Sequence, residues 1–182
     1  MKIEPLSIDG AFKITPKKIS DSRGAFSRLV CADIFSQHGL NTNWVQMNTS
    51  QNSKKGTVRG LHYQRLPHAE IKLVRCVRGK AFDVFVDLRK GSSSYGTACS
   101  LTLDSDAFES VYIPQGCAHG FQTLTDDVEL HYMHSKFYTP KYEAGIQLND
   151  PTLDINWPLP FTVISEKDKT HPMMNRIEPV IL

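Results

Sequence analysis

Hydrophobic and polar residues alternate with the two-residue period of β-strands along most of this chain. The alternation is clearest over 80–88, where Phe82, Val84, Val86 and Leu88 share one face and Asp83, Phe85 and Asp87 share the other. We predict further strands at 11–19, 26–30, 44–48, 57–64, 71–78, 97–103, 108–113, 119–124 and 128–138. Many short strands at nearly even spacing are typical of a sandwich or barrel, so we predict an all-β fold.

Helical signals are few in this sequence. Residues 32–38 precede Gly39 and are predicted to form a short helix that ends there. Ser165 lies three residues before Asp168, which resembles a capping box and predicts a helical turn. Residues 21–24 are predicted to form a turn and 51–56 a polar loop, and Pro16 indicates that segment 11–19 is an edge strand or ends at the proline. With no internal repeat or linker, we expect a single domain over 1–182.

Composition excludes several classes of protein. Of the 182 residues, 40% are hydrophobic, which is enough to bury a core without staples. The net charge is +2, from 21 basic and 19 acidic residues, so we expect neither a nucleic-acid nor a membrane partner. The N-terminus has no signal-peptide pattern and no stretch approaches 18 apolar residues, which predicts a soluble cytoplasmic protein. The widely spaced cysteines include no Cys-x-x-Cys pair and are expected to be free thiols: Cys31, Cys76, Cys99 and Cys117.

The segment 59–78 carries an unusual density of polar side chains between residues that favour a core, and we interpret it as one wall of an active site. Strand parity places Lys72 on one face with Val74 and Cys76. The alternative is that Lys72 lies on the solvent face. Arg59 and His62 are three residues apart and cannot share a face of a flat strand. Either the strand bulges there, or one of the two serves a different subunit.

A later strand carries Leu130, Tyr132 and His134 on one face. If Tyr132 and Lys72 both face the interior with His62, one cavity holds a phenol, an ammonium and an imidazole. These groups can move a proton and stabilise an enolate.

The segment Tyr112-Ile-Pro-Gln-Gly-Cys-Ala-His119 contains Pro-x-Gly-x-x-His, which is similar to the second conserved motif of cupins, the double-sheet jelly rolls. In metal-binding cupins an earlier His-x-His and a glutamate complete the ligand set, because imidazole and carboxylate suit a divalent metal. Here that place reads His62-Tyr-Gln64, with Glu70 further on. Glutamine is a poor replacement for a histidine ligand, so we expect no metal. His119 is then available for hydrogen bonding, or is a satisfied core histidine.

A family resemblance extends over nearly the whole chain, in order. It rests on Asp21-Ser-Arg-Gly-Ala-Phe26, Trp44-Val-Gln46-Met-Asn48, Val58-Arg-Gly-Leu-His-Tyr-Gln64, Lys72-Leu-Val, Phe82-Asp-Val-Phe-Val-Asp-Leu-Arg89, Ile113-Pro-Gln-Gly-Cys-Ala-His-Gly-Phe121, Asn149-Asp-Pro and Ile155-Asn-Trp-Pro158. Together these segments resemble the dTDP-4-dehydrorhamnose 3,5-epimerase family. The resemblance implies a cupin-type jelly-roll barrel without metal or other cofactor, in a homodimer that exchanges N-terminal strands. It also implies an epimerase of a nucleotide-diphosphate 4-keto-6-deoxyhexose in deoxysugar biosynthesis.

The resemblance assigns roles by matching position. His62 would be the general base, Asp168 its orienting carboxylate and Tyr132 the opposing acid, with Lys72 and His119 lining the site. The positions that match nucleotide and diphosphate contacts are Arg23, Phe26, Gln46, Asn48, Arg59 and Tyr138. Strand exchange would let Arg23 and Phe26 reach a neighbour's pocket. Lys167, beside Asp168, either reaches the site or points to water.

The expected chemistry explains these residue types. A ketone at carbon 4 acidifies the hydrogens on carbons 3 and 5, and the resulting enolate needs a preorganised cation or donor, for which Lys72 is the candidate. A histidine held in one tautomer by a carboxylate is an effective base near neutral pH. Tyr132 could deliver a proton from the opposite face, although its ordinary pKa of about 10 requires help from the local field.

Several alternatives stay open. Arg28 stands where the family usually carries an acidic residue, which leaves both thymine and cytosine possible as the nucleobase of the substrate. Inversion at carbon 3 alone, a metal-dependent cupin such as a dioxygenase, and a non-catalytic sugar-binding jelly roll are the competing functions. We expect His38, His68 and His171 to be surface groups, and Trp44 and Trp157 to be core or loop anchors, while His134 could lie near the site.

Overall fold

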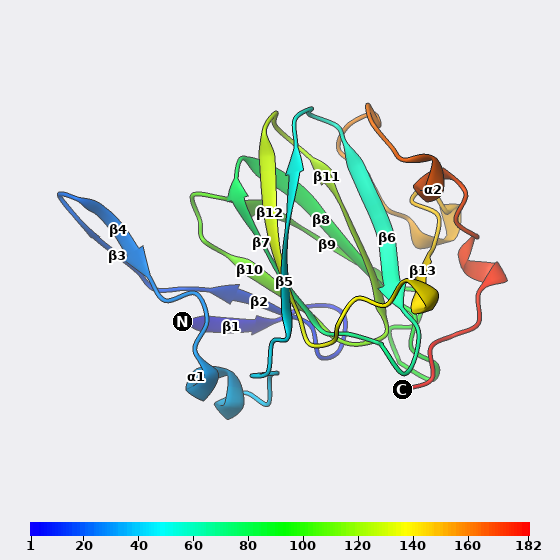
Figure 1. Ribbon diagram of the computed structural model, residues 1–182, viewed down its shortest axis with the longest axis horizontal. Helices are drawn as coiled ribbons and strands as arrows, with labels where there is room; N and C mark the ends of the chain where they lie inside the picture. Colours follow the sequence, from blue (N-terminus) through cyan, green and yellow to red (C-terminus); the bar gives the residue numbers. More distant parts are fainter.

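Strands are the predominant regular secondary structure in a computed structural model that describes residues 1–182 (Figure 1). They are β1 (Lys2–Pro5), β2 (Phe12–Thr15), β3 (Lys18–Asp21), β4 (Gly24–Ser27), β5 (Gln46–Asn52), β6 (Val58–Gln64), β7 (Lys72–Arg78), β8 (Lys80–Asp87), β9 (Ala98–Asp104), β10 (Ser110–Ile113), β11 (Cys117–Thr123), β12 (Val128–His134) and β13 (Glu143–Gly145). The helices are α1 (Ala32–Gln37) and α2 (Glu166–Lys169), with 3-10 turns η1 (Pro140–Tyr142), η2 (Pro151–Leu153) and η3 (Met174–Arg176). The predicted all-β class with few short helices is confirmed.

Two antiparallel sheets form the jelly roll. One has the order β1-β2-β10-β7-β12-β5 and the other β13-β6-β11-β8-β9. The main core takes Val74 and Leu130 from the first sheet and Phe85 and Phe121 from the second, so it lies between the two sheets. The hairpin β3-β4 belongs to neither sheet and extends away from them (Figure 1).

Most predicted strands correspond to observed ones, but the strand predicted at 26–30 shares only residues 26 and 27 with β4. Segment 11–19 divides into β2 and β3 around Pro16, because proline cannot donate to a strand ladder. Of the two alternatives for this segment, the strand end at the proline is confirmed, because β2 ends at Thr15. The edge position is wrong, since β2 lies between β1 and β10, and the edge strand β1 was not predicted. The strand predicted at 44–48 is observed as β5, which begins at Gln46 and continues to Asn52 because it pairs with β12 over that whole length. The loop predicted at 51–56 is therefore wrong for its first two residues. The strand predicted at 128–138 ends at His134, and β13 was not predicted.

Strand β6 bulges between Arg59 and His62. Its register against β11 pairs His62 with His119 and Arg59 with Phe121, so three residue steps on β6 oppose two on β11. Gly60 has φ 118, and a Cβ there would lie 2.6 Å from the Cα of Gly120. Only glycine fits such a position. Of the two alternatives for Arg59 and His62, the bulge is confirmed.

Both sheets are covered on their outer faces. Met174, Leu153 and Ile146, from the C-terminal region, pack on the five-stranded sheet, and this region carries α2. On the six-stranded sheet, Phe35 of α1 is fully buried against Ile14 and Leu73, a contact that contributes about 1.5–3 kcal/mol for a side chain of this size. No helix has the length and apolar character needed to cross a bilayer.

Candidate active site

A cavity of about 580 Å³ opens in the jelly roll and gathers most of the predicted site residues. The predicted residues that line it are Gln46, Asn48, Arg59, His62, Lys72, His119, Tyr132, Tyr138, Lys167 and Asp168. They come from β5, β6, β7, β11, β12, α2 and the segment that follows β12. Lys72 faces this interior, so its alternative place on the solvent face is wrong.

Three predicted residues do not reach the cavity in this chain. Arg23 lies in the turn of the β3-β4 hairpin, its side chain 88% exposed and paired with Asp21. Phe26 on β4 is 69% exposed, and Arg28 follows β4 and is also exposed. A phenylalanine this exposed on a projecting hairpin lacks a packing partner within its own chain.

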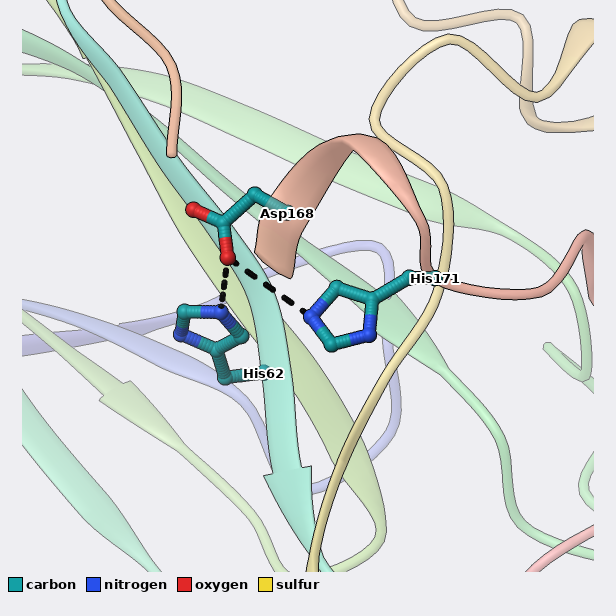
Figure 2. Close-up of side chains that lie close together, drawn as sticks. All are labelled: His62, Asp168 and His171. Atoms are coloured by element: carbon teal, nitrogen blue, oxygen red, sulfur yellow. Dashed lines mark hydrogen bonds and ion pairs between the residues drawn. The ribbon is translucent and has the colours of Figure 1, made fainter. Parts of the chain in front are cut away.

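His62 and Asp168 form the central pair of the cavity (Figure 2). The Nε2 atom of His62 lies 2.7 Å from Oδ1 of Asp168. The side chain of His62 is 32% exposed and that of Asp168 only 4% exposed. The imidazole therefore faces the cavity with a buried carboxylate behind it.

Local structure fixes the carboxylate of Asp168. The hydroxyl of Ser165 accepts the backbone N–H of Asp168, which is the predicted cap of α2, and the N–H of Gly60 donates to Oδ2. Burial raises the pKa of Asp168, but hydrogen bonds from His62 and Gly60 outweigh it and hold the pKa below its usual value. An ionised carboxylate can only accept, so Nε2 of His62 carries the hydrogen. Its Nδ1 atom is then free to take a proton.

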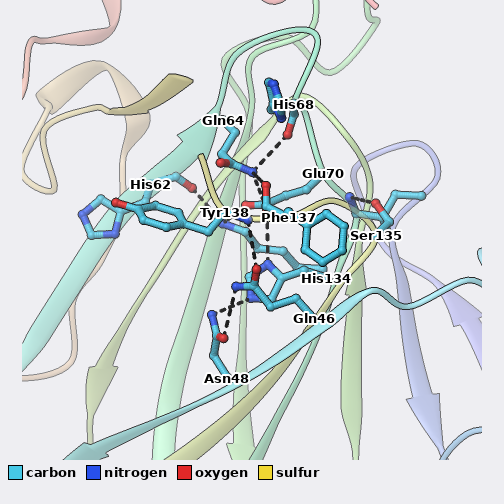
Figure 3. A network of polar contacts seen from close by, with 12 residues as sticks. Gln46, Asn48, His62, Gln64, His68, Glu70, His134, Ser135, Phe137 and Tyr138 are labelled. Carbon is cyan, nitrogen blue, oxygen red and sulfur yellow. Dashed lines mark hydrogen bonds and ion pairs between the residues drawn. The ribbon is translucent and has the colours of Figure 1, made fainter. Parts of the chain in front are cut away.

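Lys72 is held by a network of buried polar groups, of which Figure 3 shows Glu70, Gln64 and His134. Its Nζ atom lies 3.1 Å from Oε1 of Glu70 and donates to the carbonyl of His62 at 3.2 Å. Burial raises the pKa of Glu70, but the Lys72 ammonium and the ring of His134 lower it more, so the group stays ionised. Lysine is rarely buried without a partner, and here the partner is Glu70.

The same network includes Gln64 and Glu70, which stand at positions where metal-binding cupins carry ligands. The amide of Gln64 donates to Oε2 of Glu70 at 2.9 Å, and its oxygen accepts the backbone N–H of Thr139. Glu70 is also 3.2 Å from Nδ1 of His134, whose Nε2 accepts from Asn48. Each of these groups already has a protein partner. His134 therefore lies at the site, which was one of the two open alternatives.

The nucleotide-binding candidates extend this chain of contacts toward the rim. Gln46 donates to Asn48 and accepts the backbone N–H of Tyr138, as drawn in Figure 3. The hydroxyl of Tyr138 donates to Glu143, which also pairs with Lys167 at 2.6 Å. Lys167 thus both lines the cavity and remains 55% exposed.

Tyr132 faces the cavity from β12. Its ring centroid lies 6.0 Å from that of His119 and 6.3 Å from that of His134. Burial raises the pKa of Tyr132 above its usual value, so the local field does not lower it as we expected. The phenol is therefore a protonated donor across the whole neutral range.

His119 forms a second histidine–carboxylate pair. Its Nε2 atom lies 2.8 Å from Oδ2 of Asp83 on β8, with side chains 5% and 0% exposed. It is a satisfied buried histidine and also lines the cavity, so the two interpretations apply together. In the sequence, Asp83 shares one face of segment 80–88 with Asp87, and this pair of acidic residues on a buried strand is the signal that could have identified Asp83.

The prediction that His171 is a surface group is wrong. Its side chain is 10% exposed, and its Nε2 atom lies 3.6 Å from Oδ1 of Asp168 (Figure 2). Burial and the nearby His62 lower the pKa of His171. The ring rests on the backbone of Gly145, where a Cβ would lie 2.5 Å from Nε2. The spacing of three from Asp168 was the signal that could have placed it.

The predictions for His38, Trp44 and Trp157 are confirmed, whereas that for His68 is not. His38 is exposed, whereas His68 is partly buried and tilted against the ring of Tyr142 at 4.5 Å. Trp44 packs edge-on against Tyr112, and Trp157 packs against Phe82, as expected for anchors.

Comparison with known proteins agrees with this geometry. The family model described as dTDP-4-dehydrorhamnose 3,5-epimerase matches residues 5–176. A protein of that name from Methanothermobacter thermautotrophicus is 41% identical over 97% of this chain and 95% of its own length. A dTDP-4-dehydrorhamnose 3-epimerase from Streptomyces niveus is 39% identical over 93% of this chain and 82% of its own.

A solved structure is similar to this chain over nearly its whole length. The dTDP-6-deoxy-D-glucose-3,5-epimerase from Legionella pneumophila, in complex with dTDP-4-keto-L-rhamnose, is similar with a TM-score of 0.91 and 36% identity. That similarity covers 97% of this chain and 94% of the Legionella chain. Fold, cavity and sequence agree, and the chain belongs to the dTDP-4-dehydrorhamnose 3,5-epimerase family.

Proposed function

We propose that this protein inverts carbons 3 and 5 of a dTDP-linked 4-keto-6-deoxyhexose by removing and returning protons through an enolate. The observation that carries the proposal is the pair formed by His62 and Asp168 at 2.7 Å, in one cavity with the phenol of Tyr132. Simple sugar binding requires no base in the same cavity as an acid. The activities named for the relatives, which are isomerases of such sugars, support the same reaction.

The base is Nδ1 of His62. Asp168 accepts the hydrogen on Nε2 and so fixes the tautomer that leaves Nδ1 unprotonated. When Nδ1 takes the proton from carbon 3 or carbon 5, the ring becomes an imidazolium, and the ionised carboxylate stabilises that charge. General base catalysis of this kind contributes about 100- to 10,000-fold to the rate.

The enolate oxygen is stabilised by Lys72. An ammonium has three donors, and the contacts to Glu70 and to the carbonyl of His62 occupy two of them. The third is available for the oxygen on carbon 4. Because Lys72 is held before substrate arrives, its charge requires no reorganisation as the enolate forms.

Tyr132 returns a proton from the opposite face of the sugar ring. Burial keeps its phenol protonated, which suits a donor. His119 lies beside it, its Nε2 tied to Asp83, and serves as a fixed polar wall of the sugar pocket. Inversion follows because removal and return occur on different faces.

The nucleotide is held at the rim by groups of two chains. Arg59 donates from Nε to Asn52 at the end of β5, which orients its guanidinium. Gln46 and Asn48 share a face of β5 with Asn52, and Gln46 accepts the backbone N–H of Tyr138. Arginine suits diphosphate oxygens and an aromatic ring suits a base. We propose that Arg23, Phe26 and Arg28 reach the cavity of a partner in a homodimer, because their hairpin projects from its own chain.

Complementation tests the exchanged hairpin. One variant carries Arg23→Ala with Phe26→Ala, and the other carries His62→Ala. If the hairpin serves the partner, a mixed dimer has one site with both His62 and the hairpin intact, and activity returns on mixing after dissociation. Activity that stays absent after subunits have exchanged contradicts the assignment.

The reaction itself is tested by proton NMR in deuterated water, with dTDP-4-keto-6-deoxyglucose and its CDP counterpart as substrates. Deuterium at carbons 3 and 5, dependent on His62, is the expected result. Label at carbon 3 alone assigns the narrower activity named for the Streptomyces niveus relative. Exchange with the CDP sugar instead would make cytosine, and not thymine, the nucleobase that this protein accepts. No exchange with either sugar contradicts the proposal.

We also place the reaction in the cytoplasm. All four cysteines are unpaired, as a reducing compartment favours.

A further inference from the structure

Three metal-ligating atoms converge beside the proposed base. They are Nε2 of His62, Oδ1 of Asp168 and Nε2 of His171, and all lie within 4.8 Å of one another (Figure 2). Two imidazole nitrogens and one carboxylate oxygen form a donor set that zinc and similar divalent ions accept. The epimerisation proposed above uses His62 and Asp168 but assigns no role to His171.

His171 has the property expected of a ligand. Its Nε2 atom is buried and has no hydrogen-bond partner, since 3.6 Å to Asp168 exceeds hydrogen-bond range. Buried polar atoms nearly always have a partner, so an orphaned imidazole nitrogen aimed at a carboxylate requires an explanation. A metal ion between the two would satisfy both.

The spacing of these atoms suits a tetrahedral ion. Zinc binds nitrogen and oxygen at about 2.0–2.2 Å, which places neighbouring ligand atoms about 3.3 Å apart. The observed separations, 2.7 Å from His62 to Asp168 and 3.6 Å from Asp168 to His171, lie on either side of this value. The remaining separation, between the two imidazole nitrogens, is within 4.8 Å. His62 and Asp168 line the cavity, from which a water molecule can complete the coordination.

The surroundings hold the ligands in place. The N–H of Gly60 occupies Oδ2 of Asp168, which leaves Oδ1 facing the two rings. Gly145, which pairs with His62 across β13 and β6, has no side chain where the ring of His171 lies. Such outer contacts orient metal ligands and commonly change affinity by about 10- to 100-fold.

We propose that His62, Asp168 and His171 bind one zinc-type divalent ion and that the bound ion inhibits the enzyme. The ion binds Nε2 of His62, whose hydrogen leaves as a proton to solvent, and withdraws electron density from the ring. Nδ1 then becomes a weaker base. Because Nε2 faces Asp168 and not the sugar, kcat falls while KM changes little. Only the inhibition rests on the proposed function, whereas the binding does not.

Calorimetric titration of the untagged, metal-stripped full chain with zinc chloride tests the binding. One ion per chain is expected, and His171→Asn and His171→Gln are both expected to weaken it by at least about tenfold. His38→Asn, at an exposed histidine, and Cys31→Ser, at the least buried thiol, are the controls and should bind as the wild type does. Absence of binding, or equal binding by the His171 variants, overturns the site.

Cobalt(II) gives a readout that does not depend on turnover. A visible absorption spectrum of a four-coordinate ion is expected with the wild type and its loss with both His171 variants. A spectrum unchanged in those variants overturns the assignment of His171.

Inhibition is measured with the dTDP sugar at several zinc concentrations, each variant being compared with its own zinc-free rate. A fall in kcat that a chelator reverses, weakened in both His171 variants, supports the proposal. Zinc that binds in calorimetry but leaves kcat unchanged overturns the inhibition alone. A protein that binds zinc and has no zinc-free turnover contradicts the proposed function and leaves the metal site intact.

Discussion

Two histidine–aspartate pairs lie side by side in this molecule. His62 on β6 and His119 on β11 are direct cross-strand partners, and each places Nε2 within 2.8 Å of a carboxylate. The surroundings differ, because the His62 side chain is 32% exposed and the His119 side chain only 5%. On this difference we base the proposal that the open imidazole of His62 acts as the base, whereas the enclosed imidazole of His119 forms a fixed wall of the pocket.

The two carboxylates differ as well. Asp168 is supplied by the short helix α2, far along the chain from β6, and both of its oxygens have partners. Asp83 comes from the neighbouring strand β8, and its Oδ1 atom is buried without a hydrogen-bond partner. An unpartnered buried polar atom costs about 1–3 kcal/mol. The enclosed pair is thus the less well satisfied of the two.

Removing the imidazole of His62, which is open to the cavity, should have the largest effect on kcat. We expect His62→Asn to lower kcat by about 100- to 10,000-fold, because no other group has an unprotonated nitrogen held at that place. His131→Asn is the matched control, since His131 is also 32% exposed and 3.5 Å from a carboxylate but lies outside the cavity. Equal losses in the two variants would contradict the assignment. The measurement is steady-state turnover with thermal unfolding as a check on the fold.

Removing the acid should separate proton removal from inversion. In Tyr132→Phe the base remains, so we expect deuterium still to enter from solvent while the inverted product falls by about 100-fold. The readout is NMR, which compares label in recovered substrate with label in product. Loss of exchange and inversion to the same extent would show that Tyr132 acts before the enolate forms.

Neutralising each carboxylate sharpens the comparison between the pairs. Asp83→Asn is expected to lower the free energy of unfolding by about 1.5–3 kcal/mol, the value of a hydrogen bond to a charged group. Its kcat should fall less than that of Asp168→Asn, which loses the partner of the base. Urea unfolding and turnover measure the two effects. A kcat loss as large as that of Asp168→Asn would make His119 a second catalytic base.

Asp87 provides a carboxylate with a purely structural task. It is fully buried and accepts from Arg89, Ser92 and Ser94. Burial raises its pKa, but these hydrogen bonds outweigh it and lower the pKa from 3.8 to about 2. A lowered pKa gives stability that is present above pH 3.8 and is lost as the pH falls to about 2, here about 2 kcal/mol.

The check on Asp87 is the free energy of unfolding in urea at pH 5 and at pH 2.5, for the wild type and for Asp87→Asn. The variant should lack this part of the acid loss, and its kcat near pH 7 should equal that of the wild type. An acid loss of the same size in the variant would assign the effect to other carboxylates.

Sequence periodicity predicted much of the fold. Alternation along β8 and the glycine after α1 are local signals, since strand parity and helix ends depend on neighbouring residues alone. Parity grouped Lys72 with Val74 and Tyr132 with Leu130 but left open which face points inward, and the resemblance supplied the pairing of His62 with Asp168. The edge position of β2 was wrong because sheet order depends on which strands meet, and local sequence does not encode that.

By itself the sequence determined the all-β class, the strand faces and the residue types of a proton-transfer site, because these follow from local periodicity and chemistry. Only the tertiary structure decided that β6 bulges to turn Arg59 and His62 into one cavity, and that His119 is closed off by Asp83. It alone brought His171 beside Asp168. Each of these depends on contacts between segments distant in the chain, where packing geometry and not sequence spacing sets which groups meet.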